Sequence, residues 1–186
     1  HNRLALETVE AVTRLLGDAR LRVVILPGNH DPATAESVYR RGGLADPANV
    51  DVLGVTADGV VTLAELGLEV LGRAHDDYAD MSPLHPGRPR QLPHQVIVAH
   101  GHYVAGPADE HRSWKIYGEQ IAATGADYVA LGHWDRAVEA GDGTVPAAYS
   151  GSPQVAGSIN VIRLGAVAAV ERVALVEADE DGRSAV

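Results

Sequence analysis

Histidines follow three short apolar segments of this chain, each time in a motif that also contains glycine. The three pairs of segment and motif are RVVILP with GNHD (22–31), QVIVA with HGH (95–102) and DYVAL with GHWD (127–135). The chain has no cysteine, so any metal must be held by His, Asn, Asp or Glu side chains, backbone or water. Such ligands suit Mn, Fe, Zn or Mg. The three motifs therefore predict a divalent-metal site, provided that they lie close together.

The apolar segments indicate how the motifs could meet. A short, continuous apolar run is typical of a strand that is buried on both faces, and ligands of α/β sheets bind beyond the carboxyl ends of the strands. If the three strands lie parallel and adjacent, His30, His100 and His133 converge at one edge. The glycines of the motifs allow sharp turns and close approach of the backbone. A single histidine after a strand is more often a hydrogen-bonded loop residue, so the repetition carries the argument.

The remaining sequence predicts an α/β chain in which these strands alternate with helices and a β-rich stretch. A helix is expected over 3–16, with Asn2 as its N-cap and Gly17 at its end, and a second helix over 34–41. The further elements predicted are a hairpin turning at 65–67, a proline-rich loop over 81–93, a helix over 113–124, a strand over 145–149 and an antiparallel pair over 158–164 and 167–176.

Composition places the chain among globular proteins. Its 186 residues are 46% hydrophobic and 22% charged, which suits one domain with a sizeable core. We assign this domain to residues 1–176 and predict a solvated tail over 177–186, where the acidic and small residues gather.

Charge and hydropathy restrict the expected partners. The net charge is −10, and the basic footprint typical of tight nucleic-acid binding is absent from the sequence. A metal centre is itself a local positive charge. The negative net charge therefore does not exclude a polyanionic substrate. No run approaches the roughly 20 apolar residues that span a bilayer. No membrane partner is expected, and the cytoplasm is the default location.

The order of the motifs resembles that of the calcineurin-like metallophosphoesterases. GNHD at 28–31 is the most specific short motif of that family, His100 matches its strand-terminal histidine, and GHWD at 132–135 is similar to its GHxH motif. YSGSP at 149–153 is similar to a segment of the nuclease-like branch and of small bacterial phosphodiesterases. The resemblance covers about residues 1–176. It implies a four-layer α/β/β/α sandwich and hydrolysis of phosphate esters with two metal ions.

The resemblance also implies roles for individual residues. Asn29, His100 and His133 would bind one metal ion. His30 would protonate the leaving oxygen or stabilise charge in the transition state. Asp31 would orient His30 through its second ring N–H, although it could equally be the N-cap of the helix that follows.

Three further residues keep alternative interpretations. His102 either lines the phosphate site or forms hydrogen bonds within its loop. Asp135 stands where the family has histidine, and it either binds the other metal ion or pairs with Arg136. His75 follows a predicted strand, where it is either an exposed loop residue or part of the rim of the site.

The first two motifs of the family, DxH and GDxxD/N, have no counterpart in this sequence. The chain is therefore expected to begin just after them, as an N-terminally truncated domain. Two ions are expected in a complete enzyme, with Mn favoured over Fe, Zn or Mg, and at most one well-formed site here. The fragment alone would be poorly active.

The sequence thus predicts a metal-dependent phosphoesterase, with a phosphodiesterase or a nuclease-like enzyme as the favoured type. The alternative is a non-catalytic relative that serves as a scaffold for protein contacts, and Asp135 favours it. DNA ends, cyclic nucleotides and small diesters are all open as substrates. The YSGSP segment favours nucleic acid, whereas the acidic net charge argues against it.

Overall fold

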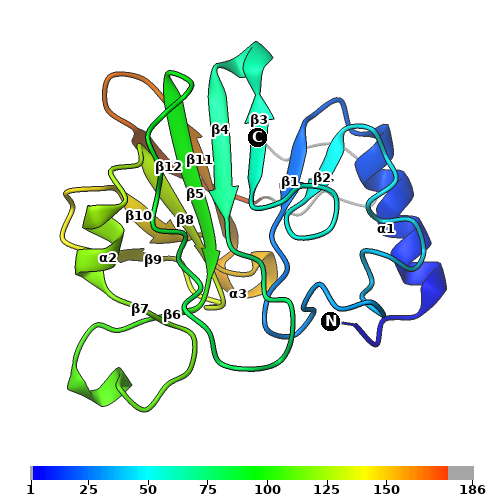
Figure 1. Ribbon diagram of the computed structural model, residues 1–186, viewed down its shortest axis with the longest axis horizontal. Helices are drawn as coiled ribbons and strands as arrows, with labels where there is room; N and C mark the ends of the chain where they lie inside the picture. Colours follow the sequence, from blue (N-terminus) through cyan, green and yellow to red (C-terminus); the bar gives the residue numbers. More distant parts are fainter. Residues whose placement is uncertain (1, 176–186) are drawn as a thin grey trace.

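The computed structural model describes residues 2–175, and the predicted tail at 177–186 lies outside this part of the chain (Figure 1). The protein is a mixed α/β chain in which strands predominate. Its helices are α1 (Leu6–Asp18), α2 (Gly118–Ala123) and α3 (Pro153–Ala156), with short 3-10 turns at η1 (Ala64–Leu66) and η2 (Pro107–Asp109). No helix among the described residues is long and apolar enough to cross a membrane.

A six-stranded sheet is the largest element of the fold. Its strands, in spatial order, are β3 (Val60–Leu63), β4 (Leu68–Gly72), β5 (His94–His100), β8 (Tyr128–Gly132), β10 (Ala147–Tyr149) and β9 (Val138–Ala140). The four central strands are parallel, and the two outer strands are antiparallel to their neighbours. His100 lies opposite Gly132 in the register. The expectation that the second and third motifs follow adjacent parallel strands is therefore confirmed.

The strand before GNHD belongs to a different sheet. β1 (Val23–Ile25) pairs in parallel with β2 (Val50–Val52), and α1 lies beside this pair (Figure 1). Val9 of α1 packs with Val50 and Val52 in a core of its own. The prediction that all three motif strands are neighbours in one sheet is thus wrong for the first of them. Its apolar side chains find their partners on α1 and β2 instead.

Burial alternates along β5 rather than covering both faces equally. Gln95, Ile97 and Ala99 are buried, whereas Val96 and Val98 are only half-buried. Ile97 belongs to the main core of the sheet, while Val98 packs on a smaller cluster near β3 and β4. The strand is therefore anchored strongly on one face, which fixes the face on which His100 emerges.

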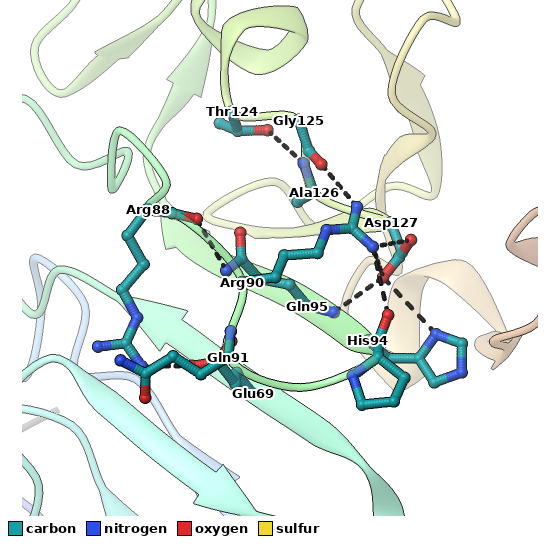
Figure 2. Close-up of polar contacts among 11 residues, drawn as sticks. Glu69, Arg88, Arg90, Gln91, His94, Gln95, Thr124, Gly125, Ala126 and Asp127 are labelled. Atoms are coloured by element: carbon teal, nitrogen blue, oxygen red, sulfur yellow. Dashed lines mark hydrogen bonds and ion pairs between the residues drawn. The ribbon is translucent and has the colours of Figure 1, made fainter.

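The amino ends of β4, β5 and β8 are tied to the proline-rich loop by polar contacts, of which those of Glu69 are buried (Figure 2). Glu69 is fully buried and accepts hydrogen bonds from the Arg88 guanidinium and, at 2.9 Å, from the Gln91 backbone N–H. Nη1 of Arg90 donates hydrogen bonds to both carboxylate oxygens of Asp127, at 2.8 and 3.0 Å. This cluster lies at the end of the sheet opposite His100, so it supports the sheet without contributing to the site.

Two further two-stranded sheets complete the architecture, one antiparallel and one parallel. β11 (Ser158–Arg163) and β12 (Ala169–Ala174) form an antiparallel hairpin, as predicted. β6 (His102–Tyr103) and β7 (Lys115–Ile116) pair in parallel. Because residues 115–116 are extended, the helix predicted over 113–124 is shortened to α2.

The helix predicted over 34–41 is a succession of turns. The backbone N–H of Val38, which would bond Thr34 in a helix, donates instead to Oδ1 of Asn2 at 3.0 Å. Asn2 also donates to the carbonyl of Pro32 at 3.0 Å. It therefore does not cap α1, whose N-cap is Ala5; a distant side chain has overridden the local helical pattern.

Candidate metal centre

Side chains of all three motifs meet at one point. Asn29 is 7% exposed, and its Oδ1 lies 2.9 Å from Nε2 of His100 and 3.3 Å from Nδ1 of His133. These residues follow strands of two different sheets. We call Asn29, His100 and His133 the candidate metal centre.

The GNHD turn that presents Asn29 is held by Asp31. Its Oδ1 accepts the Gly28 backbone N–H at 3.2 Å, and its Oδ2 accepts the Tyr39 hydroxyl at 2.6 Å. Burial, together with this hydrogen bond, raises the pKa of Tyr39 far above its usual value, so the hydroxyl stays protonated and remains the donor. Both oxygens of Asp31 thus serve the turn, a role that neither alternative from the sequence describes: no helix follows, and the bonds do not run to His30.

The His100 ring fits between two glycines of the motifs. A Cβ at Gly28 would lie 2.7 Å from Cε1 of His100, and a Cβ at Gly132 would lie 2.9 Å from its Nδ1. Contacts this short do not occur between real side chains, so both positions require glycine for reasons of space. The backbone approach that the motifs predicted is therefore used to enclose this imidazole.

The surroundings of the centre favour the neutral form of both imidazoles. Burial lowers the pKa of His100 to about 4, and the neighbouring His133 and His75 act in the same direction. Burial also lowers the pKa of His133, with additional contributions from His102, His30, His75 and Arg112. A neutral imidazole has a lone pair to offer a cation, so these shifts suit metal binding.

A cavity of about 360 Å³ opens on the centre. It is lined by His30, His100, His133, Asp135 and the 150–152 turn of the YSGSP segment. His30 and Asp135 are exposed, and the backbone carbonyl of Asp135 accepts the Ser152 N–H at 3.0 Å. The two residues therefore line the same cavity as the centre without belonging to its three-way contact.

His75 is fully buried, so the prediction of an exposed loop residue is wrong. Its Nε2 lies 2.8 Å from the carbonyl oxygen of His100, and its ring packs edge-on against His100 and Trp114 with centroids 5.7 Å away in both cases. The polar residues that follow His75 in the sequence, Asp76 and Asp77, do not indicate that it is buried. The available signal was its place just beyond β4, whose carboxyl end lies beside that of β5.

Both ring nitrogens of His102 are engaged within the protein. Nδ1 accepts the indole N–H of Trp134 at 3.1 Å, and Nε2 lies 3.4 Å from Oδ1 of Asp109. These contacts favour the loop interpretation of His102 over a direct contact with substrate. Asp109 itself was not singled out from the sequence, because only the fold brings it back to His102.

The donors present fit a divalent cation in part. Two neutral imidazoles and an amide oxygen suit Mn, Fe or Zn, and they already point at one another. Among residues 2–175, however, no three His, Cys, Asp or Glu side chains form a group that could hold a metal ion. Asn29 is therefore needed as the third donor, and it brings no charge.

Comparison with known proteins adds no relative to this picture: neither a protein-family model nor a curated protein matches the chain.

Proposed function

We propose that this chain is a metal-dependent hydrolase of phosphate esters of the calcineurin-like type, acting as a phosphodiesterase or in a nuclease-like reaction. The observation that carries the proposal is the meeting of Asn29 with His100 and His133 at 2.9 and 3.3 Å. The three residues come from the three motifs that resemble that family. A six-stranded sheet with a second, β1–β2 layer beside α1 is compatible with its four-layer sandwich.

The residues that would hold the metal are Asn29, His100 and His133, with Mn²⁺ as the first candidate. When bound, such an ion supplies Lewis-acid polarisation of a phosphoryl oxygen and lowers the pKa of water. The protein's part is to keep both imidazoles neutral, through burial, and to fix the amide through the Asp31-braced turn.

His30 is the proposed general acid. It lines the cavity beside His100 and His133, and its side chain is exposed, so a substrate can reach it. An imidazole at this position can donate a proton to the leaving oxygen of a phosphate ester. Asp31 supports it indirectly, by holding the turn on which His30 lies.

A positive charge whose field reaches the centre favours an anionic substrate. Arg112 contributes to the lowered pKa of His133, although less than burial, His102, His30 and His75 do. A cation beside a cation-binding centre opposes metal binding unless an anion lies between them. An anionic group such as a phosphate ester would offset both positive charges.

The scaffold alternative rests on Asp135. Its side chain is exposed and forms no group of three metal-binding side chains within residues 2–175. Within residues 2–175, a second metal ion would therefore find no group of three metal-binding side chains near Asp135. The alternative predicts a folded chain that binds at most one ion and hydrolyses nothing.

Hydrolysis of bis(para-nitrophenyl) phosphate with increasing Mn²⁺ separates the two proposals. The enzyme proposal predicts a rate that saturates with Mn²⁺ and that disappears in Asn29→Ala and His133→Ala. Gln91→Ala, which removes an exposed side-chain amide at the end of the sheet opposite His100, is the control for unspecific effects of substitution. Mn²⁺ binding without hydrolysis would favour the scaffold, and a rate that is equal in the wild type and Asn29→Ala would overturn the enzyme proposal.

A further inference from the structure

His133 occupies a strained backbone conformation. Its φ is +112°, a region that residues other than glycine rarely adopt, at a typical cost of about 1–3 kcal/mol. Such a conformation persists only where the surroundings impose it. The next residue, Trp134, is held by a ring stack and by a hydrogen bond.

One face of the Trp134 ring packs against the ring of Tyr149. The two rings stack with centroids 4.6 Å apart and planes 11° from parallel. Tyr149 is fully buried; its hydroxyl donates to the Gly101 carbonyl at 2.6 Å and accepts the Tyr103 N–H at 2.9 Å. The stacking partner of Trp134 is thus itself held by burial and by two hydrogen bonds.

A chain of hydrogen bonds holds Trp134 at its indole nitrogen. An indole N–H can only donate, so Nδ1 of His102, 3.1 Å away, must accept. The His102 proton then lies on Nε2, which faces Oδ1 of Asp109 at 3.4 Å. The other oxygen of Asp109 accepts the Ala105 N–H at 3.1 Å. The order of donors is therefore fixed from Trp134 through His102 to Asp109.

We propose that Asp109, His102 and Trp134 form a positioning chain that holds His133 in its strained conformation and so aims its Nδ1 at Asn29. This inference rests on the proposed metal centre. It assigns the loop between β6 and β7 to the support of a metal ligand, and it gives His102 a supporting role in place of substrate binding. Hydrogen-bonded groups behind a metal ligand commonly tune affinity in this way.

The test is the Mn²⁺ affinity of Trp134→Phe, measured from the loss of the free-ion EPR signal. The phenyl ring keeps the stack on Tyr149 but has no N–H for His102. We expect the dissociation constant to rise about 10-fold, the lower end of the effect of removing a group bonded to a ligand, because the chain reaches His133 only through the adjoining backbone. Tyr117→Phe is the control: it also removes a hydrogen-bond donor carried by an aromatic ring, but this donor bonds Glu110 and not a residue of the positioning chain. We expect it to bind as the wild type does.

A double-mutant cycle with Asp109→Asn shows whether the three residues act as one chain. If they do, the second substitution costs little once the first is made, and the combined loss of affinity is smaller than the product of the two single losses. Multiplicative losses would overturn the chain. Thermal unfolding of each variant separates a loss of fold from a loss of ligand position.

Nitrogen NMR of the histidines tests the same chain without metal. The proposal requires His102 to be the Nε2–H tautomer in the wild type, and a mixture of tautomers in Trp134→Phe. An Nδ1–H tautomer in the wild type would overturn it. A wild-type chain that binds no Mn²⁺ would overturn the metal centre itself. Binding that is equal in wild type and Trp134→Phe would overturn the positioning chain alone.

Discussion

The amide oxygen of Asn29 lies 2.9 Å from Nε2 of His100, although the two residues follow strands of different sheets. The contact joins the β1–β2 layer to the carboxyl end of the six-stranded sheet. The centre therefore depends on the packing of one layer against the other, and a ligand bound to both residues would stabilise that packing.

His30→Ala separates catalysis from metal binding. Because His30 lines the cavity but is outside the contact between Asn29, His100 and His133, we expect Mn²⁺ affinity to stay unchanged. The turnover of bis(para-nitrophenyl) phosphate should fall by roughly 10²–10⁴-fold, the usual contribution of a general acid. Metal affinity and turnover are measured on the same preparation. Loss of Mn²⁺ with the substitution would reassign His30 as a ligand.

Arg112→Ala should change the affinity for phosphate and the affinity for Mn²⁺ in opposite directions. Removing a positive charge near His133 weakens the binding of inorganic phosphate and raises KM, while the affinity for Mn²⁺ in the absence of phosphate stays equal or increases. Calorimetric titrations with each ion provide the measurement. Arg14→Ala, which removes the same charge from an exposed position on α1, is the control. Parallel weakening of both ions by Arg112→Ala would contradict the proposed role.

Glu69→Gln should destabilise the fold without touching the site. The Gln91 N–H and the Arg88 guanidinium hold the pKa of Glu69 below its usual value. A depressed carboxyl pKa stabilises the folded state above the ordinary value of about 4.3, and this contribution is lost as the pH falls through the folded pKa.

The loss at neutral pH should stay below the roughly 3–5 kcal/mol found when fully buried pairs lose a partner, because the Arg88 side chain is 31% exposed. Urea unfolding at neutral and acidic pH measures it, with the exposed Glu119→Gln as control. The difference between wild type and Glu69→Gln should shrink on acidification. A difference that is independent of pH would show that the charge of Glu69 does not support the fold.

The sequence predicts the centre better than it predicts the elements around it. Glycine next to histidine after an apolar strand is a local pattern, and the space that Gly28 and Gly132 leave for the His100 ring gives it a physical reason. The pairing of β5 with β8 follows from the same apolar runs. The pairing of β1 with β2 in a separate sheet could not be predicted. A short apolar run shows that a strand is buried but does not show which strand lies beside it.

The misplaced elements all depend on contacts between distant residues. Asn2 takes the N–H of Val38 that a helix would need, and no local pattern in 34–41 reveals this. His75 is buried by packing against His100 and Trp114. Asp109 becomes a partner of His102 only through the folding of the loop between them.

The coordination of bound Mn²⁺ is the most direct test of the central claim. Pulsed EPR detects nitrogen nuclei bonded to the ion, and the account predicts the signals of two imidazole nitrogens in the wild type. Either His100→Ala or His133→Ala should leave one, while Asn29→Ala should retain both and weaken binding. Mn²⁺ bound without imidazole nitrogen, or a spectrum unchanged by the histidine substitutions, would contradict the assignment of this centre.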